Sequence, residues 1–301
     1  MPDPAISIRG LAKHYGRLVA VSDLTLDVVA GEVFGFLGLN GAGKTTTIRV
    51  LLDLLRPTRG RASIFGRDCQ ADGLAARAAT GYLPSEIGFY SDMTGEDTLR
   101  LIARLSRQRV DAAYRRRLED RLEFASADLG RRLREYSGGM KRKLGIIQAF
   151  QADPPLLILD EPSEGLDPLM QEAFYDLLAE VKGRGRTVFL SSHVLPEVER
   201  VCDRVAVLRT GRLALVAAVD EIRSLAPRRV RVTFGGDVPF EPGLLPAAFT
   251  VIEIQPTRWS LNAQGPLGPL VTSLAGLPVE DIEVHEPRLE DILIRYYRDS
   301  S

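Results

Sequence analysis

A glycine-rich segment that ends in a lysine and a threonine has the residue types and spacing of a phosphate-binding loop. Residues 38–45 fit the pattern G-x-x-x-x-G-K-[ST], and the candidate binding positions are Gly38, Asn40, Gly41, Ala42, Gly43, Lys44, Thr45 and the next residue, Thr46. Successive N–H groups in such a loop point inward and bind anions. Lys44 would reach the β- and γ-phosphates of a nucleotide, and the Thr45 hydroxyl would bind Mg²⁺. The alternative is a turn that only joins a strand to a helix.

Two acids, Asp160 and Glu161, follow the apolar run 156–159. Asp160 is predicted to hold the water shell of Mg²⁺. Glu161 is placed to polarise a water that attacks a γ-phosphate, because ligands gather at the carboxyl ends of strands in parallel sheets. Taken alone, the pair could end a strand in an ordinary polar turn. The phosphate loop in the same chain favours the catalytic interpretation.

A third segment, Ser137-Gly138-Gly139, has the composition of a helix start, with Ser137 as the N-cap of a helix that runs to about Ala152. A helix N-terminus of this kind is a second anion-binding geometry. Two such geometries in one chain suggest a nucleotide held between two copies of the protein. An ordinary capped helix is the alternative.

These segments need a framework of alternating strands and helices. An apolar strand at 33–37 and a helix at 46–55 flank the phosphate loop, and short alternating strands surround that strand at 5–9, 24–29 and 62–65. Residues 95–135 have a charged helical pattern. Strands at 156–159, 187–191 and 204–208 are separated by helices at 169–182 and 195–202. This alternation predicts an α/β fold with a parallel, covered sheet.

The composition changes near residues 226–227. Strand-like segments follow at 230–234, 249–254, 259–261 and 280–284, with a helix at 267–277. We therefore expect a nucleotide-binding domain at 1–226, with a helical subdomain at about 90–150, and a small α+β accessory domain at 227–301.

The bulk properties exclude several classes of protein. The 301 residues have a formal net charge of -1, which gives no support for binding nucleic acid. The two cysteines form no C-x-x-C motif, so no zinc site is indicated. No stretch approaches the ~18 apolar residues that would cross a bilayer. We expect a cytoplasmic protein that works at a membrane only through another polypeptide.

The motifs occur in an order that carries a family resemblance. After the phosphate loop come Ser137-Gly138-Gly139, Asp160-Glu161, Gly165-Leu166-Asp167-Pro168 and Ser191-Ser192-His193. Over about residues 5–225 the chain resembles the nucleotide-binding subunit of an ATP-binding cassette (ABC) transporter. The resemblance implies a P-loop NTPase fold of the ABC ATPase type, with a mixed sheet, flanking helices and a helical subdomain. It also implies a head-to-tail homodimer, or a heterodimer with a related cassette, that closes over two Mg-ATP on the inner face of the cell membrane and drives separate polytopic permease subunits.

The resemblance also implies roles for single residues. Tyr15 matches the aromatic residue that stacks on adenine, Asp167 the loop that crosses to the partner, and His193 the switch histidine that contacts the γ-phosphate. Taken alone, His193 is a plain strand-end histidine. Where the family carries a glutamine that contacts Mg²⁺ and water, this chain has Ser85 followed by Glu86. Either Glu86 substitutes, or the contact is weakened.

The C-terminal segment narrows the resemblance further. Residues 286–293 are similar to the tail of drug- and antibiotic-export cassettes of the ABC-2 type, which implies an exporter. A soluble cassette ATPase of translation or DNA repair is the main alternative, but the chain has one cassette, no heptad run and no cysteine cluster. A second alternative is a regulatory module that binds ATP without hydrolysing it. Glu161 and His193 argue against that role and imply, with Lys44, a catalytic site.

Overall fold

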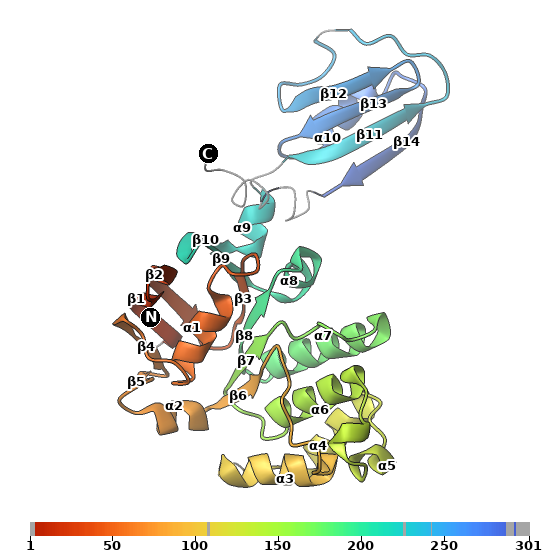
Figure 1. Ribbon diagram of the computed structural model, residues 1–301. Helices are drawn as coiled ribbons and strands as arrows, with labels where there is room; N and C mark the ends of the chain where they lie inside the picture. Colours follow the sequence, from red (N-terminus) through yellow and green to blue (C-terminus); the bar gives the residue numbers. More distant parts are fainter. Residues whose placement is uncertain (1–3, 107–108, 225–226, 242, 287–291, 293–301) are drawn as a thin grey trace. The chain divides into compact units, whose positions relative to one another are not determined.

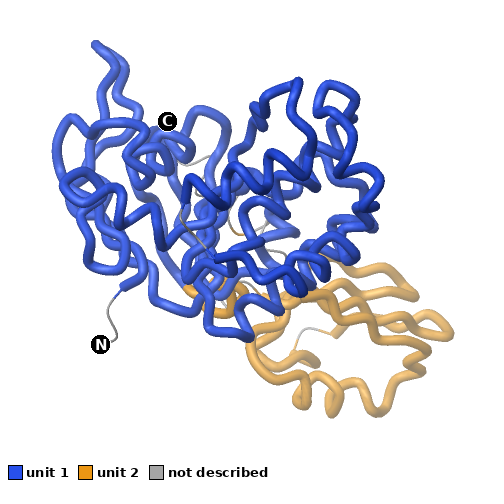
Figure 2. Tube along the Cα trace, turned by 90° about the horizontal axis from the view of Figure 1, so that it is seen from below, with its two compact units in different colours: residues 1–217 blue, residues 218–301 orange. Residues whose placement is uncertain are grey.

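The computed structural model describes residues 4–106, 109–224, 227–241, 243–286 and 292. The chain forms two compact units, residues 1–217 and 218–301 (Figure 2). We expected the boundary at 226–227. The structure places it at 217–218, and helix α9 (Val219–Ser224) therefore lies in the second unit rather than the first. Of the export-type tail at 286–293, only Glu286 and Ile292 are among the described residues.

Unit 1 contains an antiparallel sheet near the N-terminus. Strands β1 (Pro4–Tyr15), β2 (Leu18–Val29), β4 (Arg59–Ile64) and β5 (Arg67–Asp68) lie in the order β2-β1-β4-β5. The strands predicted at 5–9, 24–29 and 62–65 are present, and the first two are longer than expected. They form a sheet of their own rather than flanking the phosphate-loop strand, because that strand is paired on both edges by others.

The second sheet of unit 1 is built around the phosphate-loop strand. Its order is β10-β9-β3-β8-β7-β6, from β3 (Val33–Leu37), β6 (Thr80–Leu83), β7 (Leu156–Asp160), β8 (Thr187–Ser192), β9 (Arg204–Arg209) and β10 (Arg212–Ala218). The pairs from β9 to β6 are parallel. Every residue of β3, β7 and β8 is buried, which explains their continuous apolar runs. The predicted α/β class with antiparallel and parallel strands is confirmed.

Helix α1 (Lys44–Leu51) packs between the two sheets, against β2, β4 and β7 (Figure 1). Beneath it the rings of Phe34 and Phe36 lie 6.0 and 5.2 Å from the ring of Phe189. We expected this helix at 46–55. It begins two residues earlier and ends at Leu51, because Asp53 adopts a left-handed φ of 53° and turns the chain.

Helices cover the other side of the parallel sheet and form the helical region. Helices α7 (Pro168–Gly183) and α8 (Leu195–Val201) pack against β8, and α6 (Gly138–Phe150) packs against β6 (Figure 1). The predicted helical segment at 95–135 contains α3 (Gly95–Leu105), α4 (Ala112–Arg121), α5 (Ser126–Leu129) and a 3₁₀ turn (Leu133–Glu135). A further short helix, α2 (Gly73–Ala78), precedes β6. No helix among the described residues is long and apolar enough to span a bilayer.

Unit 2 combines one antiparallel sheet with a short helix. Its antiparallel sheet has the order β12-β13-β11-β14, from β11 (Arg228–Phe234), β12 (Phe249–Gln255), β13 (Arg258–Ala263) and β14 (Val279–His285). Helix α10 (Gly268–Leu274) contributes Leu270 and Leu274 to a core centred on Trp259. The rings of Phe234 and Phe240 lie edge-on to this tryptophan, at 4.7 and 5.3 Å.

The sole tryptophan makes the stability of unit 2 measurable by itself. Trp259 is fully buried, so its fluorescence reports unfolding of the unit 2 core. We predict that Phe234→Ala lowers the free energy of unfolding of the tryptophan-detected transition in urea by about 3–5 kcal/mol, since the change leaves a cavity beside the ring. The matched control is Phe189→Ala in unit 1. An equal shift of the tryptophan signal by both variants would contradict independent cores.

Candidate functional site

The parallel sheet brings the predicted motifs to one edge. Cα pairs across neighbouring strands join Leu37 to Ser192, Asp160 to Ser191, and Leu83 to Leu159. The carboxyl ends of β3 and β8 are therefore level, and those of β7 and β6 are each stepped back by one residue from the preceding strand. The loops that follow carry the phosphate-binding segment, His193, Glu161 and Ser85, in that spatial order.

The phosphate loop turns tightly because two of its glycines have no room for a side chain. A Cβ atom on Gly38 would lie 2.6 Å from the Leu208 carbonyl oxygen, and one on Gly43 would lie 2.4 Å from that of Ala20. Gly43, with φ 108°, caps α1, whose first residue is Lys44. The Lys44 side chain is buried and folds back over the loop, where Nζ donates to the Gly38 carbonyl at 2.6 Å.

A hydroxyl–carboxylate pair lies where β7 meets α1. Thr45 Oγ1 donates to Asp160 Oδ2 at 3.0 Å, and Ser191 Oγ donates to Asp160 Oδ1. Asp160 is fully buried, so these bonds offset the cost of burying its charge. Mg²⁺ in nucleotide sites takes one or two carboxylates together with substrate phosphates. Asp160 could supply the carboxylate, and the Thr45 hydroxyl a further oxygen ligand. No cluster of three or more His, Cys, Asp or Glu side chains that could hold a metal occurs among the described residues.

The carboxylate of Glu161 joins two cationic or titratable groups. Its Oε1 lies 3.2 Å from Lys44 Nζ, and its Oε2 lies 2.8 Å from His193 Nδ1. The backbone of Glu161 has a left-handed φ of 50°, which is strained for a residue with a side chain. Its N–H donates to both the carbonyl and the Oγ of Ser191, each at 3.1 Å. A carboxylate, an ammonium and an imidazole thus meet at one point.

A buried arginine holds the main chain behind this point. Arg142 of α6 donates through Nη1 to the carbonyls of Pro84 and Ser85, at 2.8 and 3.1 Å. Its Nε donates to Pro162 at 3.0 Å, and its Nη2 donates to the carbonyls of Asp160 and Glu161. Burial lowers the pKa of Arg142, and the nearby carboxylates oppose that shift.

A second buried charged residue near Glu161 and His193 is Glu197 of α8. Ser163 Oγ and Ser192 Oγ each donate to its Oε2 at 2.9 Å. Burial raises its pKa, although the two hydroxyls act in the opposite direction. Glu197 therefore connects the loop after Glu161 with the residue before His193.

The Ser-Gly-Gly turn opens α6 as predicted. Ser137 is the N-cap and accepts from the N–H of Met140 at 3.2 Å. A Cβ on Gly139 would lie 3.7 Å from the Gly165 carbonyl oxygen, so the turn lies beside the loop that precedes Asp167. Within the described part of the chain, no hydrogen bond joins the turn to the phosphate loop. Ser137 and Gly138 are exposed, so their surfaces are open to another molecule.

Of the remaining candidate residues, Ala42 is buried and the others are exposed or half-buried. Tyr15, at the end of β1, is 44% exposed, and Lys13 Nζ lies 5.2 Å above its ring. Asn40 and Glu86 are exposed, and Ser85 and Thr46 are half-buried. The exposed Asp167 caps α7 by accepting from the N–H of Met170 at 3.0 Å.

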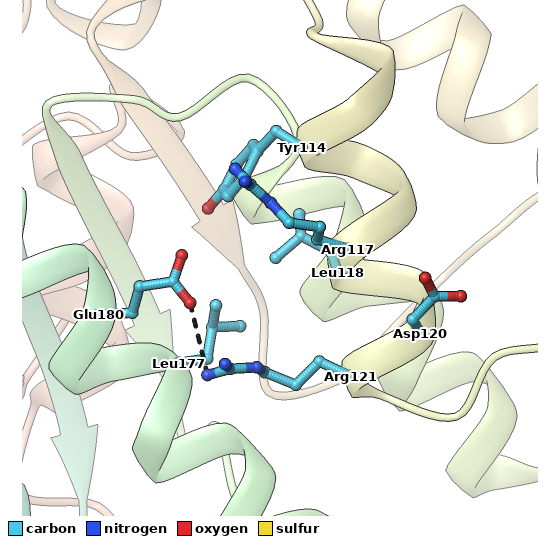
Figure 3. A pocket seen from close by; sticks show the side chains of 7 residues that line it. All are labelled: Tyr114, Arg117, Leu118, Asp120, Arg121, Leu177 and Glu180. Carbon is cyan, nitrogen blue, oxygen red and sulfur yellow. Dashed lines mark ion pairs between the residues drawn. The ribbon is translucent and has the colours of Figure 1, made fainter.

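A pocket of about 390 Å³ lies away from these residues, between α4 and α7 (Figure 3). Its lining combines apolar side chains with an ion pair of 3.4 Å between Arg121 and Glu180. The guanidinium carbons of Arg117 and Arg184 lie 5.6 and 4.5 Å from the centre of the Tyr114 ring. None of the predicted site residues lines this pocket.

Two buried charged residues of the site were missed by sequence analysis. Arg142 stands in a run of basic residues, which suggests a solvated surface. Its spacing carries the contrary signal, because Gly145 and Ile146, three and four positions on, are buried on the same helix. Glu197 gave no comparable signal, since an acid in the first turn of a helix is ordinary.

The chain is similar to proteins of one known family. A family model described as ABC transporter matches residues 21–164. The daunorubicin resistance ATP-binding protein DrrA3 of Streptomyces coeruleorubidus is 35% identical over 98% of this chain and 96% of its own length. The Nod factor export ATP-binding protein I of Bradyrhizobium diazoefficiens is 38% identical over 70% of this chain and 69% of its own.

Solved structures agree in fold. An ATP-binding subunit of an ABC transporter, 34% identical, superposes with a TM-score of 0.68 and covers 73% of this chain and 92% of its own. A bacterial ABC transporter cassette solved as a dimer, 20% identical, superposes with a TM-score of 0.66 and covers 71% and 98%. The expected ABC ATPase fold is confirmed. The chain belongs to the ABC transporter family, as an ATP-binding subunit.

Proposed function

We propose that this chain hydrolyses Mg-ATP between two cassettes and uses the closure of that dimer to drive export through separate membrane-spanning subunits. The observation that carries the proposal is the meeting of Lys44, Glu161 and His193 beside the Thr45–Asp160 pair. This combination supplies a phosphate-binding cation, a base and a γ-phosphate contact at one edge of the sheet.

ATP would be held first by its phosphates. The N–H groups of residues 38–45 and the N-terminus of α1 favour negative charge. Lys44, already buried at the loop, would neutralise the β- and γ-phosphates, and the exposed ring of Tyr15 would stack on adenine. Thr45 and Asp160 would hold Mg²⁺, which supplies charge neutralisation on the phosphate oxygens.

Glu161 would then act on water. Its carboxylate accepts a proton from the attacking water, while Lys44 stabilises the charge that develops on the γ-phosphate. His193 shares a hydrogen bond with Glu161 and would orient both the carboxylate and the γ-phosphate. The bonds from Ser191 and Arg142 to the Glu161 main chain would hold the carboxylate in line.

The second cassette would complete each site. Ser137, Gly138 and Gly139 are available at the surface, and Asp167 lies on the neighbouring loop. A head-to-tail homodimer, or a heterodimer with a related cassette, would place them over the γ-phosphate of the partner's ATP.

The names of the relatives support export, since one concerns daunorubicin resistance and another Nod factor export. The chain would be cytoplasmic and peripheral, on the inner face of the cell membrane, with polytopic permease subunits as partners and no role for nucleic acid. Co-purification with a polytopic membrane protein separates this function from that of a soluble ATPase of translation or DNA repair.

The first prediction concerns Glu161→Gln. The variant keeps the shape of the side chain and loses the base, so ATP binding should persist while steady-state phosphate release falls about 10²–10⁴-fold. Glu164→Gln, an exposed acid three residues on, is the matched control and should match wild type. Near-normal hydrolysis by Glu161→Gln would remove the catalytic assignment.

The second prediction concerns assembly. With saturating Mg-ATP, the Glu161→Gln protein should run as a dimer in size-exclusion chromatography with light scattering, because bound ATP is no longer consumed. Adding Ser137→Arg should prevent dimerisation, since a bulky cation then occupies the exposed turn. Ser126→Arg, at the exposed start of α5, is the control. A strictly monomeric Glu161→Gln protein would count against the two-cassette site.

The third prediction concerns the residues that replace the family's glutamine. Ser85 is half-buried and its main chain is held by Arg142, whereas the Glu86 side chain is exposed. We expect Ser85→Gln to raise steady-state ATPase turnover by about tenfold, which corresponds to ~1.4 kcal/mol of barrier. Glu86→Ala should leave turnover within about twofold of wild type. A large loss in Glu86→Ala would show instead that Glu86 contacts the reacting groups.

A further inference from the structure

Arg142 joins three segments of unit 1 through one buried guanidinium. Its side chain is 4% exposed, and all three of its nitrogens donate to main-chain carbonyls. The acceptors belong to Pro84 and Ser85 after β6, and to residues 160–162 at the end of β7. The arginine itself lies on α6.

A guanidinium is well suited to hold these carbonyls at fixed positions relative to one another. A planar guanidinium presents its donors in a rigid fork, so carbonyls bound to it are held at set positions relative to one another. Each bond is charge-assisted. A lysine at the same place would be a point charge with rotatable donors and could not hold these carbonyls in one arrangement.

Of the residues whose carbonyls Arg142 binds, Glu161 alone has a positive φ. Glu161 has a left-handed φ of 50°, a conformation that persists only when the surroundings impose it. Ser191 binds the N–H of Glu161, and Arg142 binds its carbonyl. The residue is thus fixed on both sides, and the direction of its carboxylate toward Lys44 and His193 depends on both bonds.

Arg142 also lies close to the Ser-Gly-Gly turn in the same helix. Ser137 caps α6, and Arg142 follows five residues later, about 7.5 Å along the axis at 1.5 Å per residue. A displacement of the helix N-terminus is transmitted over this distance because a helix is rigid on the scale of two turns.

We infer that Arg142 is a positioning residue that couples contact with the partner's nucleotide, made at Ser137–Gly139, to the orientation of Glu161 in the chain's own site. This inference rests on the proposed two-cassette ATPase. When the turn engages the γ-phosphate bound by the partner, α6 shifts, and Arg142 carries the carbonyls of Ser85 and Glu161 with it. Each site is then competent only when the other holds ATP.

The test compares Arg142→Met, Arg142→Lys and Arg142→Ala with the control Lys143→Gln, a half-buried neighbour on the same helix. Both binding of a fluorescent ATP analogue and steady-state phosphate release are measured. We expect Arg142→Met and Arg142→Lys to lower kcat per bound nucleotide about 10–100-fold, since misplacement by an ångström has that effect, with KM within about threefold of wild type. The Hill coefficient for ATP should fall toward one. Guanidinium ion should restore part of kcat to Arg142→Ala, and Lys143→Gln should match wild type.

The outcomes separate this inference from the proposed function. A kcat per bound nucleotide within about twofold of wild type in Arg142→Met overturns the positioning role. An unchanged Hill coefficient with a lowered kcat overturns the coupling between sites. If the variants bind nucleotide in a smaller fraction of the protein but keep the wild-type kcat per bound nucleotide, Arg142 has a purely structural role and the inference fails. Absence of turnover in wild type, or retention of turnover in Glu161→Gln, overturns the proposed function itself.

Discussion

Parallel pairing of β3, β8, β7 and β6 is the constraint on which the site depends. The register pairs Leu37 with Ser192, Asp160 with Ser191, and Leu83 with Leu159, so the strands end within about two residues of one another and the loops that follow lie side by side. Because every residue of β3, β7 and β8 is buried, a slip of one of these three strands would move its end residue away from the site and misalign its apolar run. The candidate site residues are therefore positioned by buried strands of unit 1 and carried by the loops that follow them.

The site concentrates charges in a place where burial makes each one costly. Lys44, Asp160, Arg142 and Glu197 are all buried, and each has polar partners. Removing one partner from such a group costs more than the bond is worth, because the remaining group stays desolvated. The Lys44–Glu161 and Glu161–His193 contacts share one carboxylate, so a change in one of them alters the other.

The local geometry of the motifs could be predicted from the sequence, but the contacts that hold the motifs in place could not. The phosphate loop, the Asp160–Glu161 strand end and the Ser137 cap carry short-range patterns whose geometry follows from a strand, a turn and a helix start. The separation into two sheets did not follow, because pairing partners of β3 lie more than 150 residues away in sequence. The early end of α1 depends on the conformation of Asp53, which breaks an apolar pattern that continues through Leu54 and Leu55. The contacts of Arg142 could not be predicted from the sequence, because its partners are main-chain carbonyls, which every residue type carries.

The most direct test of hydrolysis at the carboxyl ends of β3, β7 and β8 is a titration of Mg²⁺ at saturating ATP. Phosphate release by the purified wild-type chain is measured at each Mg²⁺ concentration. Thr45 and Asp160 imply that release rises from background with Mg²⁺ and saturates, and that Asp160→Asn removes the dependence together with the turnover. Release that is independent of Mg²⁺, or that survives unchanged in Asp160→Asn, would contradict a catalytic centre built on the ends of β3, β7 and β8.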